Sequence, residues 1–258
     1  MNVALPSGRG GALLRETGTA LLDLLLPRQC VSCDRPMFAG DVGVVCGLCW
    51  ARTLPLRAPA CPRCGHPADR FRCAWCDLLP PYVRAVRSVC WIPGGTADRI
   101  VHALKYHGWR AAASGMAQRM ARLSWPEDVL DERTALIPVP LAASRERERG
   151  YNQSEVIASA LAPLWGVPVW PDLLFRSRAT ATQTRLTPGE RSRNVAGAFG
   201  VATSRAGCLA GAHVVLVDDV VTTAATLNAC AGALLAAGTR IISYVTFGRA
   251  RASGDRLA

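Results

Sequence analysis

The segment from residue 214 to residue 226 constrains the fold of this chain more than any other. It reads Val-Val-Leu-Val-Asp-Asp-Val-Val-Thr-Thr-Ala-Ala-Thr, an apolar run followed by two carboxylates and three hydroxyls. An uninterrupted apolar run predicts a strand buried on both faces, which is typical of a parallel sheet covered by helices. Ligands of such sheets bind beyond the carboxyl ends of the strands. We therefore expect an α/β domain with a ligand site at Asp218 and Asp219.

The residues after the acidic pair are suited to a sugar phosphate. Three threonines lie where a helix, expected over residues 223–237, begins. Unpaired backbone N–H groups, the helix dipole and hydroxyl donors together favour a phosphate there. Carboxylates accept hydrogen bonds from ribose hydroxyls, directly or through magnesium. Helix capping explains one Thr or Asp, but not the whole string. The expected phosphate-binding residues are Thr222, Thr223, Ala224, Ala225 and Thr226.

Strand and helix signals alternate from residue 83 onward, which predicts a parallel sheet flanked by helices. A polar, Arg- and Thr-rich stretch interrupts them at residues 176–198, and loops of this length are usually functional. The expected strands are 88–92, 135–139, 213–217 and 240–247, with a weaker one at 167–174, and the expected helices are 96–105, 111–123, 154–165 and 223–237. The expected divisions are an arm and short helix at 1–26, a cysteine-rich unit at 27–80, the α/β domain at 83–250 and a tail at 251–258.

Eight of the 11 cysteines form four Cys-x-x-Cys pairs. Two such pairs supply the four thiolates of one tetrahedral zinc site, so the chain predicts two structural zinc ions. We favour sequential pairing, in which neighbouring pairs share an ion, over a cross-braced arrangement. All-thiolate ligation argues against a catalytic zinc, and His66 is expected at the surface. The predicted ligands are Cys30, Cys33, Cys46, Cys49, Cys61, Cys64, Cys73 and Cys76.

Three further cysteines, Cys90, Cys208 and Cys230, stand in apolar contexts and are expected to be buried thiols. The formal charge of +11 favours anionic partners, although a composition rich in Ala, Arg and Gly also follows from a GC-rich genome. The apolar run at residues 21–26 is short, is interrupted by Asp23 and does not resemble an export signal. No segment approaches the roughly 20 apolar residues of a membrane span. We expect a cytoplasmic protein.

The motifs together resemble a known family. The acidic pair and the threonine loop resemble the phosphoribosyl pyrophosphate (PRPP) signature of type I phosphoribosyltransferases, except that Ala224 stands where Gly is usual. Ile137-Pro-Val-Pro140, Arg149-Gly150-Tyr151-Asn152-Gln153, Thr182-Gln183-Thr184 and the segment 191–199, behind the cysteine pairs, resemble the ComF family of competence-associated proteins. The resemblance covers roughly residues 20 to 250. It implies a type I phosphoribosyltransferase fold with a small N-terminal double zinc ribbon, and PRPP with magnesium as ligand.

The resemblance also implies roles for individual residues. Asp218 and Asp219 become the catalytic, ribose- and magnesium-binding pair. Lys105, in Leu-Lys-Tyr-His-Gly, is a further candidate to reach the site, although a lysine at a helix end is the more ordinary account. Arg145 and Arg147 are either charge donors to the diphosphate or a solvated face. The residues implied to contact pyrophosphate are Arg149, Gly150 and Asn152. Those implied in a mobile loop that closes over the site are Arg185, Arg191 and Arg193.

Three functions remain open from the sequence. One is a phosphoribosyltransferase with an unknown acceptor. The second is a protein that acts with the DNA-uptake machinery on imported single-stranded DNA, for which Trp50, Trp75 and Trp109 among basic residues would suit base stacking; we favour ribbon or core roles for them. The third, an amidotransferase, would need a glutaminase domain that this sequence does not show.

Overall fold

The structure is a computed structural model that describes residues 27–37, 40–67, 73–92, 94–177 and 197–251. The predicted arm at 1–26, nearly all of the predicted tail, and three arginines of the predicted mobile loop lie outside the described residues. Those arginines are Arg185, Arg191 and Arg193.

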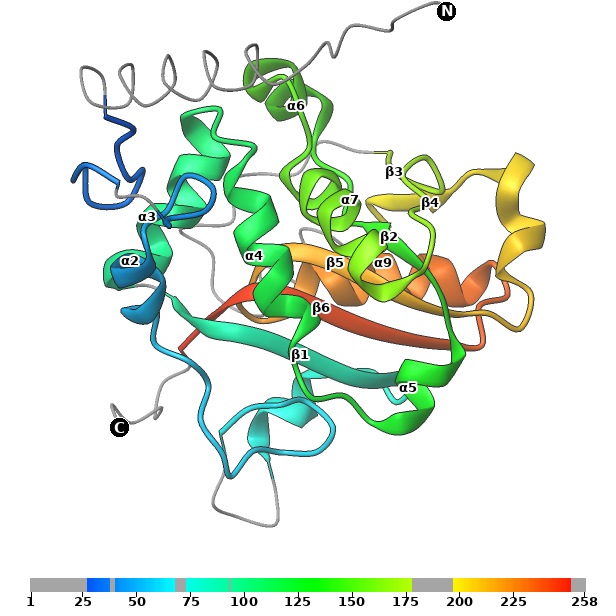
Figure 1. The fold of residues 1–258 in the computed structure, drawn as a ribbon. Coiled ribbons are helices and arrows are strands. Elements are labelled where there is room, and N and C mark those ends of the chain that lie inside the picture. Colours follow the sequence, from blue (N-terminus) through cyan, green and yellow to red (C-terminus); the bar gives the residue numbers. More distant parts are fainter. Residues whose placement is uncertain (1–26, 38–39, 68–72, 93, 178–196, 252–258) are drawn as a thin grey trace, which may run out of the picture.

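A four-stranded parallel sheet in the order β1-β6-β5-β2 forms the centre of the molecule (Figure 1). Its strands are β1 (Val83–Ile92), β2 (Arg133–Pro138), β5 (His213–Val221) and β6 (Ile241–Ala250). β5 extends past the expected end at residue 217, because Asp218 and Val220 still pair with β6. The acidic pair therefore lies within the last part of the strand, not after it.

Helices cover both faces of this sheet, as the buried strands require. Three of them, α3, α4 and α7, pack on one face, and α9 packs on the other. The helices are α3 (Gly95–Tyr106), α4 (Ala112–Ala121), α5 (Glu127–Glu132), α6 (Ala143–Arg149), α7 (Gln153–Trp165) and α9 (Ala225–Ala236). The four predicted helices agree to within two residues at each end, and α6 is a short helix that the periodicity did not indicate.

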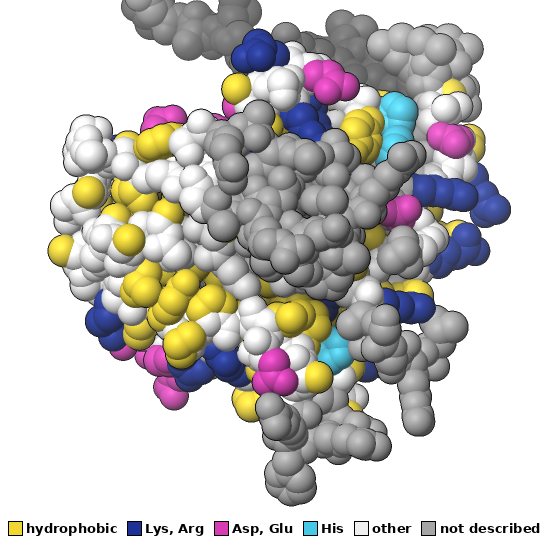
Figure 2. Space-filling model, turned by 180° about the vertical axis from the view of Figure 1, so that it is seen from behind, with side chains coloured by type: hydrophobic (Ala, Val, Ile, Leu, Met, Phe, Trp, Pro, Cys, Tyr) yellow, Lys and Arg dark blue, Asp and Glu magenta, His cyan; other side chains and the backbone are white. Residues whose placement is uncertain are grey.

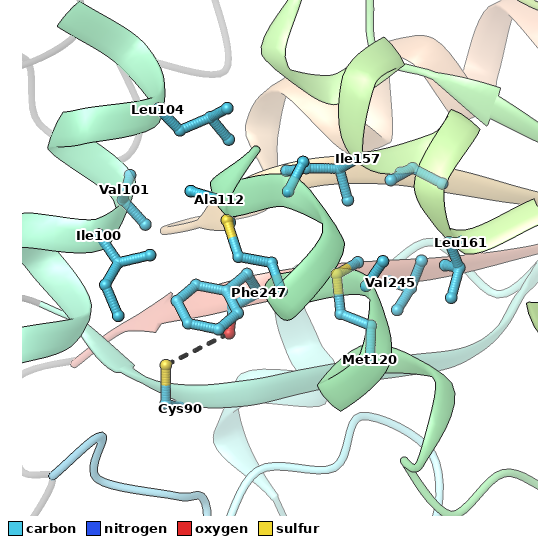
Figure 3. Packing of buried hydrophobic residues seen from close by; sticks show 14 of the residues in the cluster. Cys90, Ile100, Val101, Leu104, Ala112, Met120, Ile157, Leu161, Val245 and Phe247 are labelled. Atoms are coloured by element: carbon cyan, nitrogen blue, oxygen red, sulfur yellow. Dashed lines mark hydrogen bonds between the residues drawn. The ribbon is translucent and has the colours of Figure 1, made fainter. Parts of the chain in front are cut away.

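Phe247 of β6 stands at the centre of the core on the α3–α4–α7 side (Figure 3). Ile100 and Met120 are fully buried beside it, and the Cys90 thiol donates to its carbonyl oxygen over 3.5 Å. Burial raises the pKa of the Cys90 thiol to about 12, so this cysteine stays protonated and acts as a small apolar residue. Cys230 is also buried, but Cys208 is exposed, which corrects the expectation. Cys208 lies in the 3-10 helix η3 (Thr203–Leu209), in which Leu209 is the only buried residue.

The cysteine-rich segments contact opposite faces of the sheet. The first, with α2 (Gly47–Ala51), packs with α3 and α4. Trp50 lies at this contact, 6.1 Å from the Phe247 ring and 3.6 Å below the Arg119 guanidinium. A Cβ on Gly115 of α4 would lie 2.4 Å from the Trp50 ring, so only glycine allows this close packing. The second segment, with the 3-10 helix η1 (Ala74–Leu78), joins the core on the α9 side.

Arg249 ties the second cysteine-rich segment to β6. Its side chain is fully buried, and its Nη2 donates to the Cys64 carbonyl oxygen over 2.6 Å. Its guanidinium also lies 4.2 Å from the centre of the Trp75 ring, and its Nε donates to Ser88 of β1. A buried charge needs such partners. The boundary at residue 80 between the cysteine-rich unit and the α/β domain remains a prediction from the sequence.

A small antiparallel pair, β3 (Leu174–Arg176) with β4 (Phe199–Val201), brings together the two ends of the segment 178–196. The predicted weak strand at 167–174 is reduced to one bridge between Val169 and Leu136 and the start of β3. Among the described helices, none is long and apolar enough to cross a bilayer.

Candidate functional site

A cavity of about 480 Å³ lies at the carboxyl end of β5, where α/β sheets bind ligands. Its walls come from α3, the chain after β2, α6, the first turn of α7 and the loop between β5 and α9. The predicted site residues that line it are Asp218, Asp219, Thr222, Ala224, Ala225, Thr226 and Arg149. Those that do not line it are Gly150, Asn152 and Thr223.

The two carboxylates are held by the first turn of α7 and the last turn of α3. Oδ1 of Asp218 accepts hydrogen bonds from Ser154 Oγ over 2.8 Å and from the backbone N–H of Asp219 over 2.9 Å. Asp219 is buried, and its Oδ1 accepts from Gln153 Nε2 over 3.2 Å. Its Oδ2 forms an ion pair with the Lys105 ammonium group. Thus Lys105 does reach the site.

Burial dominates the electrostatics of the pair. It raises the pKa of Asp218 to about 8, with the Asp219 carboxylate adding to the rise and Ser154 and Lys105 opposing it. Burial lowers the pKa of Lys105, but the neighbouring Asp219 outweighs it, and the net pKa is raised. In the ligand-free protein, the electrostatics therefore favour the protonated form of Asp218 near neutral pH, while the Lys105 ammonium group pairs with Asp219. A cation at this edge would drive the proton from Asp218.

The loop after β5 adopts a conformation that favours glycine. Ala224 has φ 58° and precedes α9 without giving it a side-chain cap. The left-handed region costs an L-residue about 1 to 2 kcal/mol, so the departure from the usual Gly falls at a strained position. Within the described residues, the buried Thr223 hydroxyl has no hydrogen-bond partner.

The basic wall of the cavity is made by α6. Arg149 donates from Nη1 to Gln153 Oε1, and its guanidinium lies 5.2 Å from the centre of the Tyr106 ring. Arg145 also lines the cavity. Arg149, Gln153 and Asp219 are therefore linked in one chain of hydrogen bonds, which connects the cationic wall to the carboxylates.

Gly150 and Asn152 shape the chain between α6 and α7. Gly150, with φ 77°, ends α6 in the left-handed region. Asn152 is the N-cap of α7: its Oδ1 accepts from the Ser154 N–H over 3.0 Å, and its Nδ2 donates to the Val139 carbonyl over 3.0 Å. Both ends of the Asn152 side chain are thus occupied in positioning Gln153 and Ser154. From the sequence, Gln153 is only part of the ComF-like motif and Ser154 has no expected role, because nothing in their spacing shows that α7 begins beside β5.

The eight paired cysteines form two zinc-binding sites of four cysteines each. The ligand atoms within each group lie within 4.8 Å of one another, and the grouping follows the order of the sequence. In the first site, backbone N–H groups of Cys46 and Cys49 donate to the sulfurs of Cys30 and Cys46 over 3.3 Å and 3.4 Å, which favours thiolates. His66 stands outside both groups and stacks on Trp75. The groups are Cys30, Cys33, Cys46 and Cys49, and Cys61, Cys64, Cys73 and Cys76.

The three tryptophans considered for base stacking differ in exposure. Trp75 is buried, and Trp50 packs between the first zinc site and α4. Trp109 remains 45% exposed. Of the three, Trp109 is therefore the one most accessible to a base.

Two families match the chain. The double zinc ribbon domain matches residues 21–79, and the phosphoribosyl transferase domain matches residues 127–257. The fold and the site therefore define a phosphoribosyltransferase-domain protein with an N-terminal double zinc ribbon. Relatives with the same arrangement narrow the assignment: the chain belongs to the ComF family, which includes the DNA utilization protein YhgH.

The similarity to curated relatives spans most of the chain. The DNA utilization protein YhgH of Salmonella typhi is 34% identical over 225 residues, covering 83% of this chain and 94% of that protein. Competence protein F of Haemophilus influenzae is 37% identical over 112 residues, covering 43% and 45%. Competence protein ComFC of Bacillus subtilis is 24% identical over 201 residues, covering 75% and 79%. A solved glutamine PRPP amidotransferase from B. subtilis aligns over 53% of this chain and 26% of that chain, with 19% identity and a TM-score of 0.36.

Glycine should be tolerated better at position 224 than at position 225. In Ala224→Gly, relief of about 1 to 2 kcal/mol of backbone strain offsets the lost burial of one methyl group, about 0.8 kcal/mol. In Ala225→Gly, the first residue of α9 loses its methyl group and about 1 kcal/mol of helix propensity. Thermal unfolding should place Ala224→Gly near the wild type and Ala225→Gly clearly below it. Equal losses of thermal stability in the two variants would contradict the backbone strain at Ala224.

Asp218 should make the metal-free protein less stable as the pH rises. Its pKa is about 8 in the folded state, against roughly 4 in an unfolded chain. Stability from this group is therefore complete below about pH 4 and is lost as the pH rises toward about 8. Between about pH 6 and about pH 8 in magnesium-free buffer, the thermal midpoint should fall further for the wild type than for Asp218→Asn. Parallel falls would show that Asp218 does not carry this dependence.

Proposed function

We propose that this protein binds PRPP with magnesium in the cavity at the end of β5 and acts in the use of imported single-stranded DNA. One observation supports this ligand above all: the acidic pair, the threonine loop and two arginines of α6, Arg145 and Arg149, line the same cavity, whereas Arg147 does not. A sugar that bears phosphate at one end and diphosphate at the other needs these three kinds of contact at once. Separate capping or surface roles would not require them to meet.

Each part of PRPP has matching groups. The loop Thr222–Thr226 offers the hydroxyls of Thr222 and Thr226, which line the cavity, and the N-terminus of α9 to the 5-phosphate. Asp218 and Asp219 suit the ribose hydroxyls. Arg145 and Arg149 suit the diphosphate, since guanidinium groups bind phosphate oxygens in pairs.

Magnesium fits the same residues. It prefers oxygen ligands, keeps several waters and is commonly held by one or two carboxylates together with substrate phosphates. Asp218 and Asp219 provide that donor set, and both hydrogen bonds that Asp218 makes to described residues are accepted by Oδ1. When bound, magnesium would offset charge on the leaving diphosphate. The chain's own residues orient the ribose and hold the diphosphate.

Turnover is the alternative proposal: a phosphoribosyltransferase of nucleotide metabolism with an unknown acceptor. In such a reaction, charge stabilisation and positioning supply most of the catalysis, and no protein nucleophile is needed. The described side chains of the cavity meet that requirement. Release of pyrophosphate from PRPP in the presence of candidate acceptors would distinguish turnover from binding.

The role in DNA use rests on the relatives and on the surface. YhgH is named for DNA utilization, and competence protein F and ComFC for competence. Tyr106, which lines the cavity, is 63% exposed, and Trp109, three residues further along the chain, is 45% exposed and is followed by Arg110. Exposed rings among cations suit stacked bases and phosphates. Basic side chains also occur at several edges of the face in Figure 2. We place this activity in the cytoplasm, with the DNA-uptake machinery as partner.

PRPP binding should depend on both magnesium and the acidic pair. Calorimetric titration of the wild type should give saturable binding with magnesium and at least tenfold weaker binding without it, a difference of about 1.4 kcal/mol. The double variant Asp218→Asn/Asp219→Asn should lose the binding, because the ribose and magnesium ligands are removed. Asp131→Asn, on α5 outside the cavity, is the matched control. Absence of heat from the wild type with magnesium would refute the proposal.

Affinity for single-stranded DNA should fall steeply with salt, with a log–log slope of about −0.7 for each phosphate neutralised. Trp109→Ala should weaken binding by about 1 to 3 kcal/mol through lost stacking. Phe175→Ala is the control, since Phe175 is similarly exposed, at 47%, but lies on β3 and not beside Tyr106 and Arg110. Fluorescence anisotropy of a labelled oligonucleotide measures both effects. A flat salt response, or equal losses in the two variants, would count against this surface.

A further inference from the structure

Lys105 is the only lysine in the chain, because every other member of the 30 Lys and Arg residues is an arginine. It occupies the last turn of α3 and lines the cavity. Its ammonium group pairs with the Asp219 carboxylate, and the two side chains are only 23% and 5% exposed. The single lysine thus lies at the place where β5 presents two adjacent carboxylates to a cavity.

The choice of lysine has a physical meaning at this position. An arginine guanidinium is a planar fork of five donors that binds carboxylates in a fixed two-bond geometry, whereas an ammonium group is a compact point charge on a flexible stem. A compact cation can occupy the place of a metal ion beside a carboxylate and can leave by rotating its stem. In a chain that uses arginine everywhere else, the site carries the cation that exchanges easily.

The charges around the pair favour such an exchange. Among the described residues, Lys105 is the only cation in direct contact with either carboxylate, and that contact is with Asp219. Arg149 reaches Asp219 only through the Gln153 amide. A divalent ion that entered alone would lie within a few ångströms of the ammonium charge and would be repelled. If a diphosphate entered with the metal, its negative charge would receive the displaced ammonium group.

We propose that Lys105 is a built-in substitute for the metal cation. It neutralises Asp219 while the cavity is without ligand, and it transfers to the diphosphate when a metal–diphosphate sugar enters. This inference rests on the proposed function for the identity of the ligand. Lys105 then makes the site select a metal-complexed diphosphate over the free metal ion and over a sugar monophosphate such as ribose 5-phosphate. Neither of these two offers both a cation for Asp219 and an anion for Lys105.

The signature is a pair of opposite changes in Lys105→Met. The affinity of the zinc-loaded protein for manganese alone should rise about tenfold. It is measured from the electron paramagnetic resonance signal of the manganese that remains free. Affinity for PRPP with magnesium, measured by calorimetry, should fall about tenfold; both values lie within the usual range of coupling between bound groups. A variant that was merely damaged would lose both.

Two control variants distinguish the effect of the positive charge at position 105 from the effects of side-chain shape and of the total charge of the protein. Lys105→Arg keeps the charge and should bind manganese as weakly as the wild type. Arg122→Met removes a cation at the end of α4, outside the cavity, and should change neither affinity. Lys105→Met that binds manganese no more tightly than the wild type would overturn the inference, and so would Lys105→Arg that binds it as tightly as Lys105→Met.

A spectroscopic readout follows the ammonium group itself. Reductive methylation with ¹³C-formaldehyde labels only Lys105 and the N-terminal amine and preserves both charges. The Lys105 signal should shift when magnesium and PRPP are added together, and it should stay in place with magnesium alone or with ribose 5-phosphate. An unmoved signal while calorimetry detects PRPP would overturn the inference and leave the proposed function standing. Failure of the wild type to bind PRPP would instead refute the proposed function, while the manganese comparison would still test Lys105.

Discussion

The burial of the Asp219 carboxylate, directly beside Asp218 at the end of β5, is the constraint on which the rest of the site depends. Asp219 is almost without contact with water, and a buried carboxylate is tolerated only when other groups replace its hydration. Lys105 and Gln153 supply that replacement for Asp219 from two different helices, and Ser154 donates to the neighbouring Asp218. The ends of α3 and α7 must therefore converge on β5. The cavity is the space that this convergence leaves open.

The second determinant is the way in which the short connections are fixed. Gly150 lets α6 end sharply, and the Asn152 side chain joins α7 to the Val139 carbonyl at the end of β2. These residues do not line the cavity, yet they aim Gln153 and Ser154 at the carboxylates. Their identity in the sequence is a requirement of geometry. A ligand contact is not needed to explain it.

The sequence predicted the parallel sheet and the two zinc sites well, because buried strands and paired cysteines leave local signals. A local signal also pointed to the acidic pair as a ligand site, which stays a prediction, and both carboxylates line the cavity. The sequence could not predict that Lys105 pairs with Asp219, since the two residues are far apart in the chain and only the fold brings them together. It also placed Cys208 inside, because an apolar neighbourhood in sequence does not show which side of a short turn faces the solvent.

The placement of the zinc sites on opposite faces of the sheet has a consequence for handling the protein. Cys30 and Cys49 belong to the core on the α3–α4–α7 side, and Cys64 belongs to the core on the α9 side, where Arg249 of β6 holds its backbone. A chelator chosen to strip magnesium would compete for these ions as well, and metal sites of this kind contribute folding free energy. Loss of either zinc would loosen the same sheet that positions Asp218 and Asp219. Magnesium dependence should therefore be measured by omission or by a zinc-sparing chelator.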